Sequence, residues 1–142
     1  MIEQLVVCLP AKPGKLARMC RVMGEEGVQI HALMVSENVD VTLVRLICDR
    51  PRATAGLLSD LGYDATTTDA VAIQVDNVPG ALARLLDKLH SCDLKVAYAY
   101  SCSPDDRTVD VVKVSGEPID IKLMESGLSC LEPEDLYVPD ES

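Results

Sequence analysis

Hydrophobic and polar positions in the first half of the chain follow two different spacings. Residues 5–9 form a short apolar run, which is typical of a buried strand. After Pro13, apolar side chains recur at the i, i+3, i+4 and i+7 positions that make one face of a helix. Pro13 favours a helix start, because its fixed φ suits the first helical turn. The spacings predict strands at 5–9, 28–35, 41–48 and 63–68, with helices after Pro13 and Pro51.

The second half of the chain repeats this pattern. Pro13–Arg18 recurs as Pro79–Arg84, and the offset of 66 residues holds on both sides without a gap. A fixed period of this size indicates two copies of one supersecondary unit. The second copy is predicted to hold strands at 71–75, 94–101, 108–114 and 128–131, with helices after Pro79 and Pro118.

Two βαββαβ copies predict an α+β fold with two ferredoxin-like units side by side, each an antiparallel sheet with helices on one face. No Gly/Ser-rich or Pro-rich linker separates the copies, which favours one fused body. We expect a first unit over 1–68 and a second over 69–138, into which Leu136 and Tyr137 dock. Residues 139–142 are expected to form a loose C-terminal tail.

The predicted strands carry apolar side chains on both faces. Residues 5–9 and 41–47 do so, although a sheet covered by helices on one face alone should alternate apolar with polar residues. The chain is also 48% hydrophobic, a high share for its length. We therefore expect a homodimer in which the open sheet faces of two chains pack together. The alternative is loose patterning in a small antiparallel sheet.

The charge balance excludes several classes of partner. The formal net charge is −10, and no stripe of Lys and Arg is present for phosphate contacts, so we expect no nucleic-acid binding. No apolar run reaches the length of a membrane helix, and the N-terminus lacks the pattern of a secretory signal. We therefore expect a cytoplasmic protein that does not bind membranes.

The sequence offers little chemistry for catalysis or metal binding. Its six cysteines include no Cys-x-x-Cys pair, and we expect reduced thiols, mostly buried, with Cys102 the most exposed because Pro104 follows in an expected turn. The two histidines occupy unrelated positions in the two copies, and no nucleophile elbow, phosphate loop or dinucleotide-binding fingerprint is present. We expect no metal, no cofactor and no enzymatic activity.

One short motif points to a family. Residues 77–82 read Asn-Val-Pro-Gly-Ala-Leu, which resembles the (Asp/Asn)-x-Pro-Gly-x-Leu signature of the ACT domain, a small amino-acid-binding regulatory module. The first copy has Ala11 at the position of Asn77, so that side chain is missing there. The resemblance covers essentially the whole chain as a tandem pair and implies a stand-alone ACT–ACT protein.

The chemistry of the motif suits a ligand as well. A tight turn from a strand into a helix aims backbone N–H groups outward from the helix N-terminus, which favours a carboxylate. Gly14 and Gly80 have no Cβ, so a ligand can approach the backbone closely. Asn77 Oδ1 and strand carbonyl groups could accept hydrogen bonds from an ammonium group. The alternative is that Pro-Gly simply separates the strand from the helix.

The resemblance implies that ligands bind at interfaces between ACT units, between the first-helix loop of one unit and the second strand of its neighbour. Some candidates have structural alternatives: Asn38 can serve its turn alone, and His31 can lie in the dimer interface. Tyr98 and Tyr100, two apart on one strand face, can pack in the core under the helices. The candidate ligand-binding residues are Ala11, Lys12, Gly14, Leu16, Ile30, His31, Met34, Asn38, Asn77, Val78, Gly80, Ala81, Leu82 and Tyr100.

The resemblance and the residues together predict a non-catalytic regulator. We expect it to bind a free amino acid, or a similar small carboxylate, and to signal to a partner enzyme. The alternative is a protein-binding regulatory or structural subunit whose ligand sites are vestigial. Ala11 favours this alternative for one of the two sites, because it removes the polar side chain of the motif.

Overall fold

The computed structural model describes residues 1–141, and its contacts divide the chain into two compact units. The first unit holds Glu3–Thr68 and the C-terminal segment from Leu136 onward. The second unit holds Met1–Ile2 and Asp69–Asp135. The C-terminal segment therefore belongs with the first unit, whereas the repeat pattern assigned residues 136–138 to the second.

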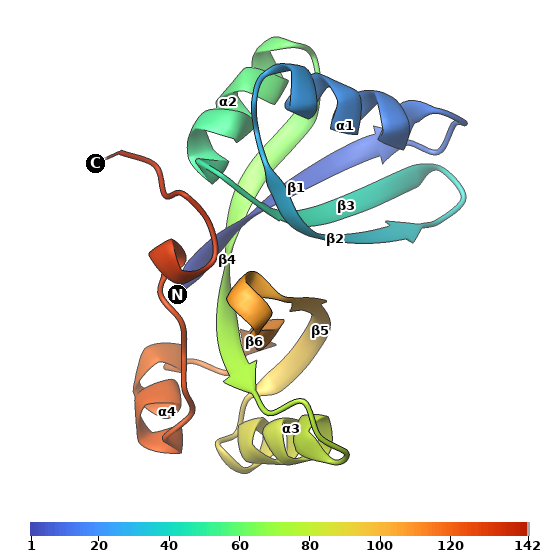
Figure 1. Ribbon diagram of the computed structural model, residues 1–142. Coiled ribbons are helices and arrows are strands. Elements are labelled where there is room, and N and C mark those ends of the chain that lie inside the picture. The colour runs from blue at the N-terminus through green and yellow to red at the C-terminus, as the bar shows by residue number, and fades with distance from the viewer. Residues whose placement is uncertain (142) are drawn as a thin grey trace. The chain divides into compact units, whose positions relative to one another are not determined.

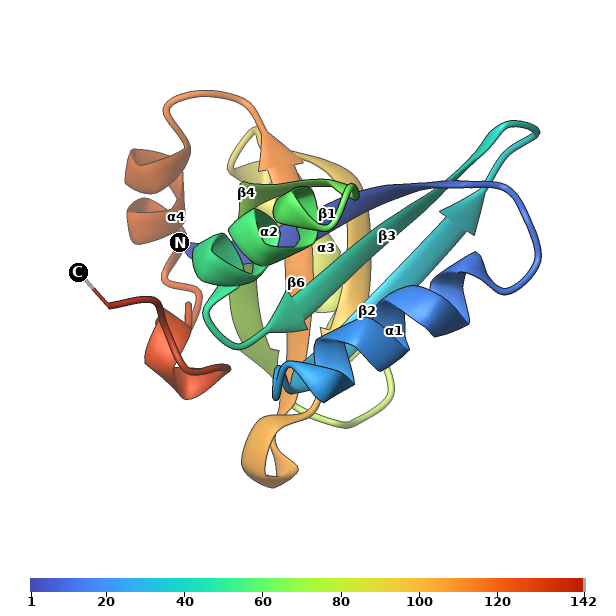
Figure 2. The same cartoon turned by 90° about the horizontal axis from the view of Figure 1, so that it is seen from above.

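The first unit contains two helices packed on four strands. In chain order the elements are β1 (Ile2–Pro10), α1 (Lys15–Glu25), β2 (Ile30–Glu37), β3 (Val41–Cys48), α2 (Pro51–Asp60) and β4 (Asp64–Val75). The strands lie in the order β2-β3-β1-β4, and β3 is antiparallel to both of its neighbours. Figures 1 and 2 show α1 and α2 on the same side of these strands.

The core of the first unit lies between the sheet and the two helices. Strand β1 contributes alternate residues, because successive side chains point to opposite faces of a sheet. Helix α1 contributes Met19 and Met23, which are four residues apart and so share one helix face. Burial raises the pKa of the Cys48 thiol to about 12, which keeps it protonated. The buried core residues are Leu5, Val7, Leu9, Met19, Met23, Val28, Val44, Leu46, Cys48, Ala55 and Leu58.

The second unit repeats this plan with three strands. After residues 69–75 of β4 it contains α3 (Ala81–Ser91), β5 (Lys95–Cys102), the 3₁₀ helix η1 (Pro104–Asp106), β6 (Thr108–Ser115), α4 (Ile119–Ser126) and the 3₁₀ helix η2 (Pro133–Asp135). Its strands lie in the order β4-β6-β5, and β6 is antiparallel to both neighbours. Its core residues are Val71, Ile73, Leu85, Leu89, Leu94, Val112, Val114 and Leu123.

The strand β4 replaces two expected strands. The sequence pattern predicts separate strands at 63–68 and 71–75, but the structure has one strand over Asp64–Val75. No glycine or proline occurs in this segment, so nothing in the backbone favours a turn between the two halves. Its first five residues belong to the first unit and the others to the second.

The last expected strand, 128–131, is reduced to an isolated bridge between Cys130 and Ile73. Pro133 follows closely and opens η2. Proline has no backbone N–H to donate to a sheet and its φ is fixed. The extended segment therefore ends before a regular ladder can form.

The C-terminal segment begins with two buried residues, Leu136 and Tyr137, which are 4% and 6% exposed. Their burial was expected, but it occurs in the first unit. The Tyr137 hydroxyl accepts a hydrogen bond from the backbone N–H of Glu3 at 3.0 Å. The Arg50 N–H donates to the carbonyl oxygen of Val138 at 2.7 Å.

Asp140 holds the end of this segment against α2. Its carboxylate accepts hydrogen bonds from the backbone N–H groups of Arg52 and Ala53, both at 2.9 Å. These are first-turn donors that the helix itself leaves unpaired, and Arg50 at the N-cap makes no side-chain cap. The segment is therefore not loose as far as Asp140, in contrast to the expected tail at 139–142. Ser142 lies outside the described residues.

No helix in the described part of the chain is both long and apolar enough to cross a membrane.

We predict that Asp140→Ala lowers the free energy of unfolding by about 1 kcal/mol, because α2 loses its N-terminal cap. Urea unfolding followed by circular dichroism measures this. Glu141→Ala is the matched control, since Glu141 is exposed and next to Asp140 in the chain. Equal stability of the two variants would show that the contacts of Asp140 do not hold the C-terminal segment.

Candidate functional site

The turn from strand to helix has the same backbone conformation in both units. Gly14, at the N-cap of α1, has φ 81° and ψ −7°, and Gly80, at the N-cap of α3, has φ 84° and ψ −7°. This left-handed conformation is strained for residues with a Cβ. Neither helix receives a side-chain cap. The first-turn N–H groups of α1 and α3 are therefore not satisfied by a capping side chain.

In the first unit this turn forms one wall of a cleft of about 660 Å³, which we call the loop cleft. Four candidates from the sequence line it: Ala11, Lys12, Gly14 and Leu16. The opposite wall comes from Val35 and Glu37 of β2 and Thr42 of β3, which the sequence pattern did not indicate. Within this unit the cleft thus combines backbone N–H groups, Lys12 and Lys15, and the carboxylate of Glu37.

The β2 candidates do not lie together, because a β-bulge changes the register. Ile30 pairs with Cys48 and packs against the core of the first unit. Between Ile30 and Ala32 the register shifts, so Met34 pairs with Arg45 on the sheet face away from the helices. Residues 33, 35 and 37 face the helices instead. A strict alternation from Ile30 predicts the wrong face for the second half of this strand.

Asn38 and His31 both have partners within the first unit. Asn38 Oδ1 accepts hydrogen bonds from the N–H groups of Asp40 (3.2 Å) and Val41 (2.9 Å), which stabilises the β2–β3 turn. His31 Nε2 lies 2.8 Å from Asp49 Oδ1. Neither side chain lines the loop cleft.

Asp49 connects His31 to the C-terminal segment. Its Oδ1 also accepts a hydrogen bond from the backbone N–H of Val138 at 2.9 Å. Burial pushes the pKa of the Asp49 carboxyl upward, but the hydrogen bonds from His31 and Val138 outweigh it and hold the pKa below its ordinary value. The His31 side chain thus helps to position the chain end through Asp49.

The loop of the second unit is open to solvent. Asn77, Val78 and Gly80 are exposed, as is Leu82, whereas Ala81 is buried at the start of α3. A Cβ added to Gly80 would lie 3.1 Å from the guanidinium Nη1 of Arg84. The polar candidate Asn77 is therefore accessible to a ligand.

Tyr98 and Tyr100 do not pack in the core under the helices. Tyr98 pairs with Lys113 and Tyr100 with Val111, whereas the core residue Val112 points to the other face. Both tyrosines are half-buried on the face opposite α3 and α4. The bulge between Val96 and Tyr98 moves them there, in the same place as the bulge in β2.

Asp110 is an acidic residue within the core-facing side of β6. It pairs with the core residue Ile73, is 8% exposed, and lies 3.4 Å from the Ser101 hydroxyl, which donates to its carboxylate. Burial raises the pKa of Asp110, and the Ser101 hydrogen bond only partly opposes this. Its counterpart in the repeat is Val44. In the sequence, a single acidic residue within the mostly apolar segment 109–114 was the signal that could have identified Asp110.

The burial of one cysteine differs from the sequence-based expectation. Cys102 is 3% exposed, because β5 continues through this residue and pairs it with Val109. Cys130 is the exposed cysteine in the described part of the chain. Residues 1–141 contain no group of three or more His, Cys, Asp or Glu placed to hold a metal ion.

Comparison with known proteins gives one family and several related folds. A family model described as an ACT domain pair matches residues 1–136. The crystal structure of protein BT0572 from Bacteroides thetaiotaomicron is 31% identical, with a TM-score of 0.86 over 96% of this chain and 95% of that chain. No match was found among curated proteins.

More distant structures share the fold alone. The ligand-free regulatory subunit of aspartate kinase from Thermus thermophilus is 13% identical, with a TM-score of 0.59 over 88% of this chain and 92% of that chain. The regulatory subunit of aspartate kinase from Thermus flavus is 12% identical, with a TM-score of 0.53 over 87% of this chain and 89% of that chain.

We predict that Asp110→Val stabilises the protein at pH 7, because it removes a buried charge and restores the residue found in the first unit. The raised pKa means that protonation relieves this penalty, so the advantage of the variant should shrink as the pH falls through that pKa. Urea unfolding at a series of pH values from 7 down to 4 measures the difference. Asp110→Asn, which removes the charge at nearly constant shape, should show the same trend. A stability difference independent of pH would contradict the burial argument.

Proposed function

The chain belongs to the ACT domain pair family, and we propose that it is a non-catalytic regulatory protein that binds a free amino acid or a similar small carboxylate. The observation that carries this proposal is the uncapped helix N-terminus behind a left-handed glycine, present in both units. Such a terminus combines first-turn N–H groups that no side chain caps with the positive end of the helix dipole, which suits a carboxylate.

The loop cleft offers complementary groups for the other parts of an amino acid. The ammonium groups of Lys12 and Lys15 add to the positive field around the first turn of α1. Across the cleft, Glu37 can accept hydrogen bonds from the ligand ammonium group. Leu16 and Val35 provide apolar surface for the ligand side chain. Every part of a zwitterion therefore has a complementary group in the first unit.

The second-unit loop differs from the first at three positions, where Asn77, Val78 and Ala81 stand in place of Ala11, Lys12 and Lys15. Asn77 can accept a hydrogen bond from a ligand ammonium group, whereas Ala11 cannot. We propose that the two loops therefore differ in affinity. The same difference favours the second candidate function, a protein-binding subunit in which the first-unit site is vestigial.

For ligand binding to have a regulatory effect, such a module must act on a partner protein. Among the related folds are proteins named as regulatory subunits of aspartate kinase, which supports signalling from this chain to a partner enzyme. Ligand binding would shift the population of one arrangement of the chain, and the partner would respond to that shift. We also propose that the protein is cytoplasmic, where the six free thiols would stay reduced.

We predict that at least one amino acid raises the melting temperature of the protein in a thermal-shift screen of the twenty amino acids at millimolar concentration. A ligand at 100 times its Kd stabilises the native state by about 2.7 kcal/mol, or roughly 5–10 °C for a chain of this size. Asn77→Ala should reduce the response, and Ala11→Asn should increase it if the first loop binds the same ligand. A flat screen of folded protein would favour the protein-binding subunit.

We also propose that two chains associate through the sheet face of the first unit that lies opposite α1 and α2. Apolar, half-buried side chains lie on this face, among them Val6, Cys8, Met34 and Leu43. Such a face is a poor surface to leave in water.

We predict that sedimentation analysis finds a dimer at micromolar concentration and that Met34→Lys dissociates it. Leu33→Lys is the matched control, because Leu33 is the adjacent residue but points to the helix side and is 43% exposed. A monomeric wild-type protein would exclude this interface, and equal dissociation by both variants would show a general loss of structure.

A further inference from the structure

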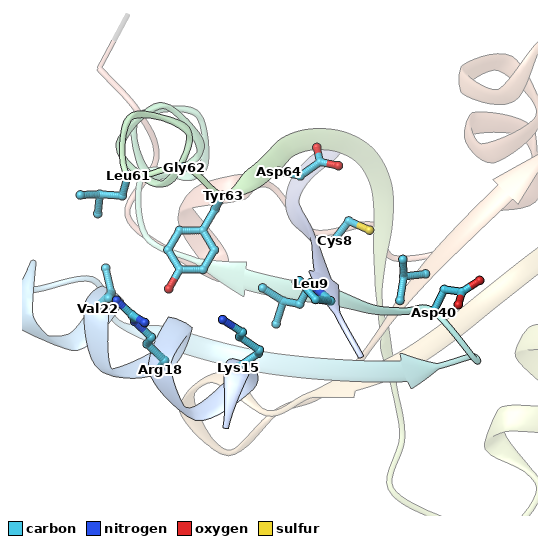
Figure 3. A pocket seen from close by; sticks show the side chains of 12 residues that line it. Cys8, Leu9, Lys15, Arg18, Val22, Asp40, Leu61, Gly62, Tyr63 and Asp64 are labelled. Atoms are coloured by element: carbon cyan, nitrogen blue, oxygen red, sulfur yellow. The ribbon is translucent and has the colours of Figure 1, made fainter. Parts of the chain in front are cut away.

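A second cleft in the first unit lies on the other side of α1, and we call it the α1 cleft. Its volume is about 760 Å³, within the range of small-molecule sites. One wall is α1, and the opposite wall is the segment 61–64 that joins α2 to β4. Figure 3 shows these walls with the side chains between them. All of its lining residues belong to the first unit.

Two cations point into this cleft from one helix. Lys15 and Arg18 are three residues apart on α1 and therefore share a face. Figure 3 shows the Tyr63 ring directed toward α1, with its hydroxyl on the side of these two residues. Within the described residues neither Lys15 nor Arg18 forms an ion pair.

These two cations lie together at one cleft of an otherwise acidic protein. The chain has 23 Asp and Glu against 13 Lys and Arg. Two neighbouring cations that face a cleft without a carboxylate within ion-pair distance thus form a local positive site in an acidic protein. Such a site attracts an anion, and the low-dielectric walls of a cleft strengthen the attraction.

The rest of the lining carries the opposite charge. Asp40 and Asp64 also line the cleft, and Figure 3 shows their carboxylates away from the Lys15 and Arg18 side of the cleft. Apolar side chains also line the cleft: Figure 3 shows Val22 and Leu61 beside Arg18, and Leu9 between Lys15 and Asp40. The lining is therefore bipolar and also offers apolar surface.

We propose that the α1 cleft is a second binding site, for a small zwitterion with an apolar body. The carboxylate of the ligand contacts Lys15 and Arg18, and the Tyr63 hydroxyl donates a hydrogen bond to it. The ammonium group faces Asp64 and Asp40. A simple anion would gain only the contacts at the first end, and a simple cation only those at the second. This inference does not depend on binding at the loop cleft, because Arg18, Tyr63 and Asp64 line the α1 cleft alone.

The two clefts nevertheless share one charged residue. Lys15 lines both of them, together with Leu9 and Pro10. A ligand that engages the Lys15 ammonium in one cleft removes it from the other. Binding at the two clefts is therefore expected to be coupled, and the coupling must be equal in both directions.

The test is calorimetric titration of the full chain with L-leucine, L-methionine and L-phenylalanine, together with amide and side-chain NMR spectra to locate binding. We expect at least one of them to bind with shifts at Arg18 and Tyr63. Arg18→Ala should weaken that binding at least tenfold. Arg21→Ala is the matched control, since Arg21 is exposed on the same helix and does not line the cleft.

The chemical class is tested with two derivatives of the tightest ligand. The N-acetyl derivative lacks the ammonium group, and the amide derivative lacks the carboxylate, so both should bind at least tenfold more weakly. Equal binding of the N-acetyl derivative would overturn the zwitterion assignment.

The site itself is tested by the variants. No binding by any of the three amino acids would overturn the proposal, and so would binding that Arg18→Ala leaves unchanged. If that binding is instead weakened by Lys12→Ala, the ligand occupies the loop cleft, which supports the proposed function and rejects the α1 cleft. Lys15→Ala should weaken binding at both clefts.

Discussion

The turn from the first strand into the first helix of each unit depends on a left-handed backbone at one glycine. Gly14 and Gly80 adopt nearly the same φ and ψ, although Lys15 follows one and Ala81 the other. Because this conformation directs the chain sharply into the helix, α1 packs over its sheet and its first-turn N–H groups remain uncapped. In the first unit, both clefts use residues that follow this turn.

Sheet register decides which side chains reach these clefts. The bulge at His31 turns Val35 and Glu37 toward the helices and moves Met34 to the open face. The second unit has a bulge in the same position of β5, and it places both tyrosines on the face away from α3. One extra residue in an edge strand thus exchanges the two faces beyond it. The repeat conserves this backbone device even where the side chains differ.

Charge is arranged unevenly on this acidic chain. The Asp140 carboxylate accepts hydrogen bonds from first-turn N–H groups of α2. The Asp49 carboxylate lies within hydrogen-bond distance of His31 and accepts a hydrogen bond from the Val138 N–H near the chain end. By contrast, Lys15 and Arg18 face a cleft without an ion-pair partner among the described residues. Acids that complete their own hydrogen bonds stabilise the fold, whereas the two unpaired cations remain available for a ligand.

The sequence by itself determined the repeat, the order of the α-helices, the strands other than β4 and the last expected strand, and the glycine turns, because local periodicity and backbone preferences encode them. It also indicated Ala11, Lys12, Gly14 and Leu16, which one contiguous loop brings together. Only the tertiary structure determined the features that depend on contacts between distant segments. A β-bulge determines the sheet face on which Met34 lies, and two expected strands are joined in β4. The Asp140 carboxylate caps α2, although the two are far apart in the sequence. These outcomes depend on pairing between segments distant in sequence, and periodicity within one segment carries no information about its partner.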